Sequence, residues 1–454
     1  MSKRSVAAAW NFLINADGGE IQNSVEAKKA KVEDDQHKGV DAEELLHLND
    51  GDKLIICMVG KSSEEKAIIA GKIGRYLSWV GYKIKQFKTV NPDPVSDKMK
   101  VQDAVKWLFG GGQVAVLDTK NSTKIERKET LQWLKESFQK KESGQDGLSH
   151  RVLWLETYRG NDSNDQAYET LDPKDDNDTF GDLEANSFIK LIDYGKTMVT
   201  HNVQGYLESK LASFCVNLHT KERVILLVRH GESMYNTEDR LGGDPALSGR
   251  GELFAKELAS YIRQAFGPVE STSAMSTDAS KDQSKHESLG SYKDLSVWTS
   301  QLQRTIQTAK QIQCRAKVPW VSLSEIDAGV CEGMTYKEFK ERLFAQYSAR
   351  QRDKLNWRYP QGESYVDVKK RLEPVIFEAE RQRKPLLIVA HRAVLRCLYS
   401  YFADIESSET PFLPFPLHTV VVLRSTAGGW DEDRVALDPV PGDTGAHEKS
   451  KQSG

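Results

Sequence analysis

Two short apolar runs in this chain each end at a histidine beside an arginine, and this pairing constrains the fold more than any other feature. Arg229–His230 directly follows Val224–Val228, and His391–Arg392 directly follows Leu386–Ala390. Continuous apolar runs of this length are typical of strands that are buried on both faces of a parallel sheet. In open α/β sheets, ligands gather beyond the carboxyl ends of such strands. The fold is therefore predicted to bring the two histidines together at one edge of a sheet.

The rest of the chain alternates between strand and helix patterns, which predicts an α/β fold with mainly parallel sheets. Leu54–Val59 is a compact strand pattern, and Glu64–Val80 carries apolar residues at helical spacing. Further strands are predicted at 84–87, 114–117, 188–193, 224–228, 295–299, 386–390 and 420–423. Further helices are predicted at 104–109, 125–138, 204–218 and 304–312.

Polar segments with little core-forming material separate these patterns, and they occupy residues 1–50, 159–186, 267–294 and 441–454. The first and the last are predicted as tails, the first with a short helix near 42–48. The acidic second segment is predicted as a long surface loop or a disordered insert. The Ser-, Asp- and Lys-rich third segment is predicted as a polar insert within a domain. Two domains are therefore placed at 51–220 and 221–440.

Composition excludes several classes of protein. With 63 Lys and Arg against 66 Asp and Glu, the net charge of −3 excludes a general nucleic-acid binder, which would need a basic surplus. The apolar runs are far too short to span a bilayer, so no membrane insertion is expected. The five cysteines lie singly without a CxxC pair, which indicates neither a zinc site nor a disulfide framework. A reducing, cytoplasmic location is expected. The apolar stretch Val6–Trp10 is too short for a secretory signal, whereas a transit peptide stays open.

The residue types that follow the first run suit phosphoryl transfer. A neutral imidazole such as that of His230 is a nucleophile, and the fork of Arg229 can neutralise phosphate oxygens. Such transfer depends on positioning and on charge stabilisation more than on elaborate covalent chemistry. Gly231 would let the backbone approach a phosphate closely. A surface histidine at a strand end is the alternative, but it does not explain why Arg229, Gly231 and Glu232 stand beside His230.

These residues resemble a known family. The string Arg229–Glu232 resembles the signature of the histidine phosphatase superfamily, which is also called phosphoglycerate mutase-like. Longer strings resemble the bisphosphatase half of the bifunctional 6-phosphofructo-2-kinase/fructose-2,6-bisphosphatase family, among them Arg304–Ala309, Glu325–Glu332, Gly362–Tyr365 and Pro416–Val420. The resemblance covers about residues 222–425 apart from the Ser-rich insert. It implies a P-loop-kinase-like parallel sheet followed by a histidine phosphatase α/β sandwich.

The resemblance also implies roles for individual residues. His230 would attack the 2-phosphate and become phosphohistidine, and Glu325 would act as general acid and then as base for water. His391 would hold the transferring oxygens together with the phosphate-binding residues Arg229, Asn236 and Arg304. No metal is expected to take part, because histidine and arginine would do the charge work.

A second cluster is implied for the sugar and its 6-phosphate, and it consists of Tyr336, Arg350, Lys354, Tyr365 and Arg396. A cluster of Arg, Lys and Tyr is what a second dianion would require. The alternative is a solvated helix face, because Arg350 and Lys354 stand four residues apart. Arg392 departs from the family, which usually has glutamine after the second histidine. This extra cation would tighten phosphate binding, slow product release or favour another phosphorylated ligand.

The N-terminal half resembles the kinase half of the same family more weakly, over about residues 53–220. A working P-loop reads GxxxxGK[ST], and this chain keeps only its first glycine and its lysine, Gly60 and Lys66. Glu65 replaces the second glycine, and Ala67 replaces the hydroxyl that would ligate Mg²⁺. Asp118 stands where the family has a Walker-B-like acid. The sequence therefore predicts a degenerate nucleotide site and a kinase fold without kinase activity; ATP and Mg²⁺ are not expected as cofactors.

The prediction from the sequence is a cytoplasmic fructose-2,6-bisphosphatase with a degenerate kinase domain. Its partner would be a small-molecule sugar phosphate, without nucleic acid or membrane. Three alternatives stay open: a histidine phosphatase for another sugar phosphate, a still-bifunctional enzyme, and a regulatory protein that binds a sugar phosphate without turnover. The family commonly forms homodimers, but the sequence does not decide the oligomeric state.

Overall fold

The computed structural model describes residues 53–61, 63–89, 93–142, 149–159, 168–172, 187–193, 195–267, 289–426 and 429–437. Both predicted tails, with the helix near 42–48, lie outside the described residues. The same holds for most of the acidic segment 159–186, of which Arg159 and residues 168–172 are described. It also holds for most of the insert 267–294, of which Gly267 and residues 289–294 are described.

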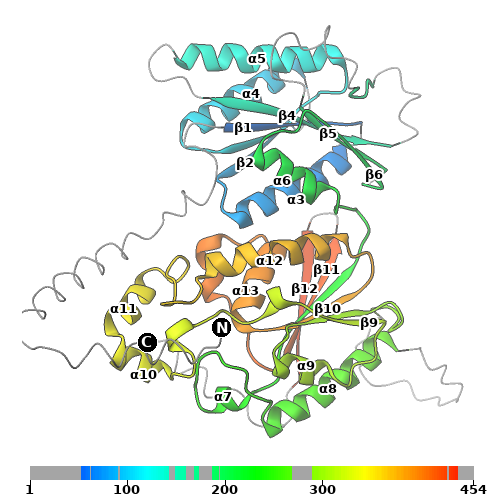
Figure 1. The fold of residues 1–454 in the computed structure, drawn as a ribbon. Helices are drawn as coiled ribbons and strands as arrows, with labels where there is room; N and C mark the ends of the chain where they lie inside the picture. Colours follow the sequence, from blue (N-terminus) through cyan, green and yellow to red (C-terminus); the bar gives the residue numbers. More distant parts are fainter. Residues whose placement is uncertain are drawn as a thin grey trace, which may run out of the picture. The chain divides into compact units, whose positions relative to one another are not determined.

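The first half of the chain folds around a sheet of six strands in the order β2-β3-β1-β4-β5-β6 (Figure 1). The strands are parallel except for β6, which pairs antiparallel with β5. Their bounds are β1 Lys53–Val59, β2 Ile84–Lys88, β3 Val114–Asp118, β4 His150–Tyr158, β5 Phe188–Ile192 and β6 Thr197–His201. The helices are α3 Ser63–Val80, α4 Pro94–Phe109, α5 Lys124–Glu142 and α6 Tyr206–Cys215. The predicted α/β alternation is confirmed, although the sequence reasoning missed β4 and β6.

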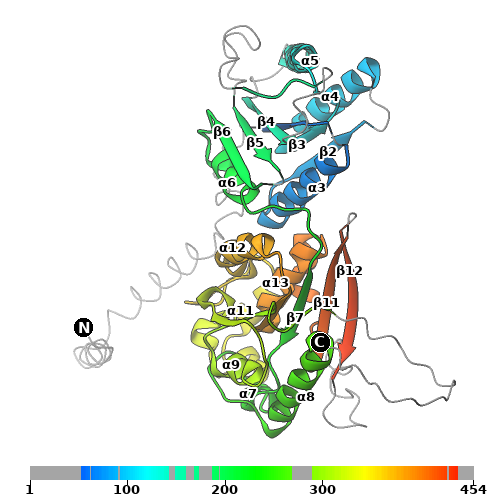
Figure 2. The same cartoon turned by 90° about the vertical axis from the view of Figure 1, so that its right-hand side faces the viewer.

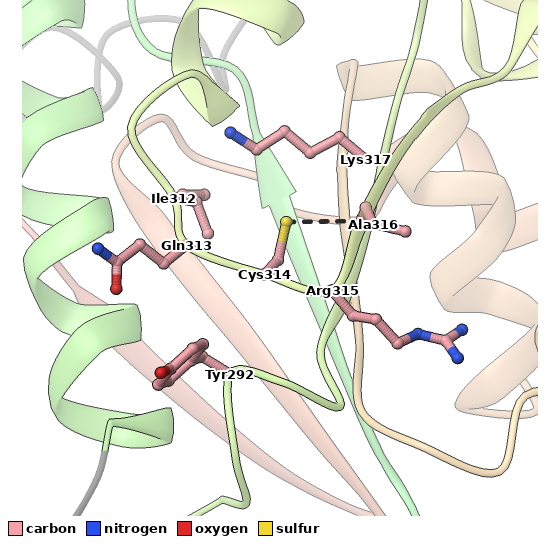
Figure 3. Close-up of a pocket in the computed structure, with 7 residues that line it drawn as sticks. All are labelled: Tyr292, Ile312, Gln313, Cys314, Arg315, Ala316 and Lys317. Carbon is pink, nitrogen blue, oxygen red and sulfur yellow. Dashed lines mark hydrogen bonds between the residues drawn. The ribbon is translucent and has the colours of Figure 1, made fainter.

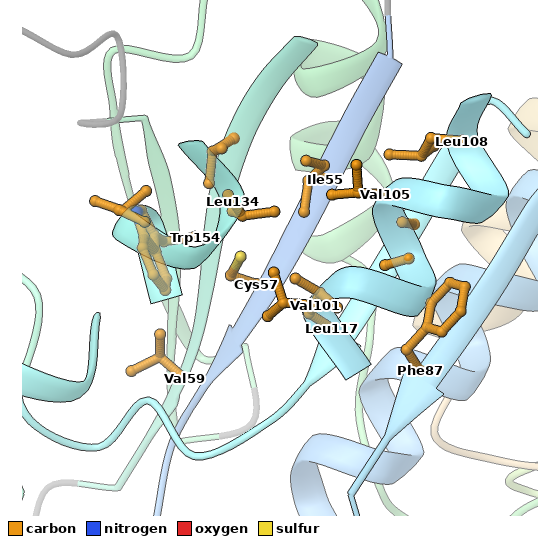
Figure 4. Close-up of a cluster of buried hydrophobic side chains, with 14 of the residues drawn as sticks. Ile55, Cys57, Val59, Phe87, Val101, Val105, Leu108, Leu117, Leu134 and Trp154 are labelled. Atoms are coloured by element: carbon orange, nitrogen blue, oxygen red, sulfur yellow. The ribbon is translucent and has the colours of Figure 1, made fainter. Parts of the chain in front are cut away.

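One core layer of this half lies between the sheet and the helices α4 and α5 (Figure 4). Alternate residues of β1, Ile55, Cys57 and Val59, face this layer together with Trp154 of β4. The acidic segment 159–186 was predicted as a loop or insert with almost no core-forming residues, but its residues Tyr168 and Leu171 belong to this core. The Tyr168 side chain is buried, and its hydroxyl donates a hydrogen bond to the buried carboxylate of Glu156 in β4. The sequence did not indicate this contribution to the core, because a single aromatic residue among acidic residues forms no periodic pattern.

The second half folds around another sheet of six strands, in the order β12-β11-β7-β10-β8-β9. The strands β7, β10, β8 and β9 are parallel to one another, whereas β11 pairs antiparallel with both β7 and β12. Their bounds are β7 Val224–Arg229, β8 Ser296–Thr299, β9 Ala316–Pro319, β10 Leu386–Ala390, β11 Thr419–Thr426 and β12 Gly429–Ala436. The two runs that end at histidines are thus adjacent parallel strands, as predicted, while β9 and β12 were not predicted.

Helices cover both faces of this sheet (Figure 2). The helices α8 and α9 pack on one face, and α12 and α13 lie on the other. The bounds are α7 Met234–Thr237, α8 Gly249–Phe266, α9 Gln303–Ala309, α10 Tyr336–Arg342, α11 Phe344–Arg352, α12 Tyr365–Arg381 and α13 Arg392–Phe402. Short 3-10 helices occur at η3 Val321–Leu323, η4 Gly329–Cys331 and η5 Ser407–Phe412. Among the described residues, no helix is long and apolar enough to cross a bilayer.

Candidate active site

Three neighbouring parallel strands deliver polar residues to one edge of the second sheet. Ala390 at the end of β10 pairs with Arg229 at the end of β7, so the residues that follow, His391 and His230, stand side by side. Their ring centroids are 5.1 Å apart. Ser300 follows the next strand, β8, and its hydroxyl lies 2.7 Å from Nε2 of His391. The predicted meeting of the two histidines is confirmed.

The orientation of His230 fixes which of its nitrogen atoms can act as nucleophile. Its Nδ1 lies 2.7 Å from the carbonyl oxygen of Gly231. Because a carbonyl only accepts hydrogen bonds, Nδ1 carries the proton and Nε2 keeps its lone pair. Gly231 is required here, since a Cβ atom on it would lie 2.6 Å from the carbonyl oxygen of Gly251. The side chain of Thr308 accepts a hydrogen bond from the Gly231 amide at 3.0 Å.

The second histidine presents an open nitrogen. His391 is fully buried, and its Nδ1 has no hydrogen-bond partner among the described residues. An unsatisfied buried nitrogen costs free energy unless a ligand or water satisfies it. Ser300 engages the other nitrogen, which leaves Nδ1 available to a phosphate oxygen. Sequence reasoning did not assign Ser300 to the site, although a small polar residue directly after a predicted strand was the signal.

Both histidines are held neutral. Burial, Arg229 and Arg304 lower the pKa of His230 well below its ordinary value. Burial, Arg304 and His230 itself lower the pKa of His391 in the same direction. A neutral imidazole is the form that can attack phosphorus, so the arginines that could bind a phosphate also favour the reactive form of His230.

Two of the predicted phosphate-binding residues, Arg229 and Arg304, lie close to this pair. Arg229 and Arg304 are 8% and 4% exposed, which places two guanidinium groups in a nearly water-free environment. Arg304 donates to the carbonyl of Gly243 at 2.8 Å. Asn236 belongs to the short helix α7, where its Oδ1 accepts hydrogen bonds from the amide and hydroxyl of Ser233 at 3.0 Å. Its amide oxygen is thus engaged in a helix cap.

Glu325 reaches the same edge from a loop. Its Oε1 accepts a hydrogen bond at 3.2 Å from the amide of Ala393, two residues after His391. This amide lies in the first turn of α13. Arg371 of α12 holds the loop, because it donates to the carbonyls of Ser324 at 2.8 Å and Glu325 at 3.2 Å. Arg371 was not predicted as a site residue, and only its long reach in the fold identifies it.

The predicted sugar-phosphate residues also form one cluster. Arg350 is 8% exposed and lies over the rings of Tyr336 and Tyr359, each at 5.6 Å. Helix α11 ends at Arg352, so Lys354 lies beyond it and the two cations are no solvated helix face. A solvated face, the alternative weighed from the sequence, is therefore wrong for this pair.

The remaining members of this cluster lie on α12 and α13. Arg396 donates to the hydroxyl of Tyr365 at 3.1 Å. Burial is the main cause that lowers the pKa of Lys354 to about 7, and the positive charges of Arg396 and Arg392 lower it further. The structure therefore gathers several cations whose mutual repulsion calls for an anion.

The residues kept from the P-loop are satisfied without a nucleotide. Lys66 Nζ lies 3.3 Å from Asp118 Oδ1, and both side chains are nearly buried. Glu65 forms an ion pair with Arg159. Gly60 has φ +149°, and a Cβ atom there would collide with the side chain of Thr157. Packing alone therefore explains this glycine.

A hollow elsewhere in the second half does not coincide with these residues. It has a volume of about 500 Å³ and is lined by Tyr292 and residues 312–317, at the start of β9 (Figure 3). Since β9 is parallel to β8, this is the edge opposite to the histidines. No group of three or more His, Cys, Asp or Glu side chains able to hold a metal ion occurs within the described ranges.

Comparison of the sequence with known proteins relates the chain to one family. Residues 282–438 match the histidine phosphatase superfamily (branch 1). The chain is 35% identical to the 6-phosphofructo-2-kinase/fructose-2,6-bisphosphatase of Arabidopsis thaliana, over 95% of this chain but only 59% of that protein. It is 35% identical to 6-phosphofructo-2-kinase/fructose-2,6-bisphosphatase 3 of Rattus norvegicus, over 85% of this chain and 72% of that protein. It is 34% identical to a fructose-2,6-bisphosphatase of Saccharomyces cerevisiae, over 84% of this chain and 88% of that protein.

Proposed function

Because the chain belongs to the 6-phosphofructo-2-kinase/fructose-2,6-bisphosphatase family, we propose that it hydrolyses the 2-phosphate of fructose 2,6-bisphosphate to fructose 6-phosphate and phosphate. The observation that carries the proposal is the buried pair His230 and His391 beside Arg229 and Arg304. The yeast relative is named for this activity alone, whereas the Arabidopsis and rat relatives are named for both activities. The chain spans 59% of the Arabidopsis protein, so activities of that longer protein are proposals here.

In the first step, Nε2 of His230 attacks the 2-phosphorus and forms an N–P bond while the bond from phosphorus to the sugar oxygen breaks. Glu325 gives its proton to the departing oxygen, and Arg229 and Arg304 stabilise the charge on the equatorial oxygens. His391 donates from Nδ1 to one of them, with Ser300 holding the ring by its other nitrogen. In the second step, water attacks phosphorus, Glu325 takes the proton of the water, and His230 leaves as neutral imidazole.

The cluster of Arg350, Lys354, Arg392 and Arg396 supports a substrate with a second phosphate. Its cations lie beside tyrosines, and none of the hydrogen bonds described for Lys354 or Arg396 reaches a carboxylate. A dianion would satisfy this charge. Arg392 supports a second candidate, a histidine phosphatase for another sugar phosphate, because it adds a cation that the family usually lacks at that position.

The test is incubation of the purified protein with fructose 2,6-bisphosphate, with fructose 6-phosphate as the readout and His230→Ala as control. Fast release that is abolished in His230→Ala supports the proposal. No release from folded protein, together with release from another sugar bisphosphate in a panel, would favour the second candidate. Tight binding of fructose 2,6-bisphosphate without any release would instead favour a regulatory binding protein.

We also propose that the first domain has lost its kinase activity. The residues present do not fit ATP and Mg²⁺: Ala67 offers no ligand oxygen, and Lys66 is bound to Asp118. Glu64 and Glu65 stand in the first turn of α3, where a phosphate would meet like charge instead of free amides. Fructose 6-phosphate, ATP and Mg²⁺ incubated with His230→Ala protein test this, since any product would then accumulate. Formation of fructose 2,6-bisphosphate would establish a bifunctional enzyme.

The location that fits this proposal is the cytoplasm. All five cysteines are free thiols in the structure, and burial raises the pKa of Cys57, Cys215 and Cys397. Such thiols are stable in a reducing compartment. Fractionation of cells that express a tagged chain would test this part of the proposal.

A further inference from the structure

One segment of the second half contacts cations at both ends of the proposed site. Residues 411–415 read Pro-Phe-Leu-Pro-Phe; the first two are the last residues of η5, and the other three follow it. Lys354 Nζ donates to the carbonyl oxygen of Pro411 at 3.0 Å. Arg396 Nε donates to the carbonyl oxygen of Leu413 at 2.6 Å. Both cations belong to the cluster assigned to the second phosphate.

The same segment ends at the histidines. Arg229, beside His230, donates to the carbonyl oxygen of Phe415 at 3.5 Å, the outer limit of a hydrogen bond. Phe415 is 3% exposed and packs edge-on against Tyr399 with ring centroids 5.4 Å apart. One short stretch of main chain therefore touches a cation of each phosphate site.

The local sequence explains this regular use of carbonyls. Leu413 has φ −58° and ψ 135°, which is polyproline-II geometry, and a residue before proline is restricted to this region. Pro411 and Pro414 have no amide hydrogen, so they offer only acceptors to the cations around them. Arg434 of β12 fixes the segment from outside, because it donates to the carbonyl of Pro414 at 3.1 Å.

Binding to these carbonyls does not consume the cations. A lysine has three donors and an arginine has five, so each side chain can keep its main-chain partner and present other donors to a phosphate. Free Lys and Arg side chains lose considerable rotamer entropy when a ligand immobilises them. The carbonyls remove part of that loss beforehand, which is the general advantage of preorganisation.

We propose that residues 411–415 form a brace that sets the separation of the two phosphate sites and so selects substrates with two phosphates at that separation. This inference rests on the proposed function. Lys354 and Arg396 are held at one end of the brace and Arg229 at the other. Pro411 and Pro414 act as positioning residues, since no side chain of the brace needs to touch the reacting atoms.

If the brace is loosened, the binding of a ligand that spans both phosphate sites should weaken more than the binding of smaller ligands. Pro414→Gly frees the backbone between the two ends. The backbone entropy that a proline removes corresponds to a change in an equilibrium constant on the order of fivefold. The KM for fructose 2,6-bisphosphate should rise about fivefold, because only this ligand spans both ends. The kcat/KM for para-nitrophenyl phosphate and the inhibition constant of fructose 6-phosphate should stay within twofold. Pro94→Gly, at the exposed first residue of α4, is the matched control and should change none of the three.

The outcomes separate the brace from a general structural role. An equal loss for all three ligands, or no change in any, would overturn the brace. Wild-type protein that leaves fructose 2,6-bisphosphate intact would overturn the proposed substrate and the brace together, whereas active wild type with an unchanged variant would overturn the brace alone. Pro414→Ala, with a thermal melt beside it, replaces Pro414→Gly if the glycine variant does not fold.

Discussion

Lys354 should make substrate affinity depend on pH near 7, far below the range in which an ordinary lysine loses its proton. Burial and the neighbouring cations Arg396, Arg350 and Arg392 lower the pKa of this ammonium group to about 7. A bound phosphate dianion would restore the charged form, so binding requires a protonated Lys354. Because the pKa is lowered in the free protein, affinity is greatest well below pH 7 and is lost as the pH rises through 7.

The size of the effect follows from the protonated fraction. Half of the free protein carries the charge at pH 7 and about a tenth at pH 8, so KM should rise about fivefold across that unit. The substrate does not obscure this, since phosphate monoesters lose their second proton near pH 6. The histidines do not obscure it either, because the pKa values of His230 and His391 lie well below this range.

The assay is steady-state hydrolysis of fructose 2,6-bisphosphate between pH 7 and pH 8.5, with kcat and KM fitted separately. Lys354→Arg keeps its charge throughout this range and should give a flat KM, and Lys354→Met should give a flat but raised KM. A wild-type KM that does not change with pH, or an equal slope in Lys354→Arg, would refute the reasoning.

Three further predictions concern residues that support the site. Ser300→Ala should lower kcat about tenfold with little change in KM, because one hydrogen bond that orients the second histidine is lost; rapid-quench kinetics would show a slowed phosphorylation step. Arg371→Met should lower kcat on the order of a hundredfold, because it releases the loop that carries Glu325, the proposed general acid, whereas Arg381→Met, exposed on the same helix, should not. Glu380→Gln should destabilise the fold by about 3 kcal/mol in urea titrations, because it leaves the buried guanidinium of Arg223 without its carboxylate partner.

The sequence was informative where chemistry follows an uninterrupted strand. The runs before His230 and His391 have a single structural interpretation, and parallel pairing then brings the two residues to one edge. The strand β4 was missed although Val152–Leu155 is a continuous apolar run, which polar residues flank on both sides. The buried carboxylate of Glu156 accepts hydrogen bonds from Tyr168, Thr170 and the amide of Leu171, and Lys190 lies 3.7 Å from it.

Main-chain acceptors are what sequence reasoning could not supply. Lys354 and Arg396 could be expected to bind phosphate from their types and positions, but nothing in those types indicates that carbonyls of the segment 411–415 hold them. Every residue has a carbonyl, so an acceptor leaves no mark in the sequence, and only the prolines hint that the backbone there is constrained. The same argument applies to Arg371, whose partners include the carbonyls of Ser324 and Glu325 as well as the carboxylate of Glu363. In this site the side chains supply the charge and the backbone supplies its placement, so Lys354→Met and Pro414→Gly should both raise the KM for fructose 2,6-bisphosphate.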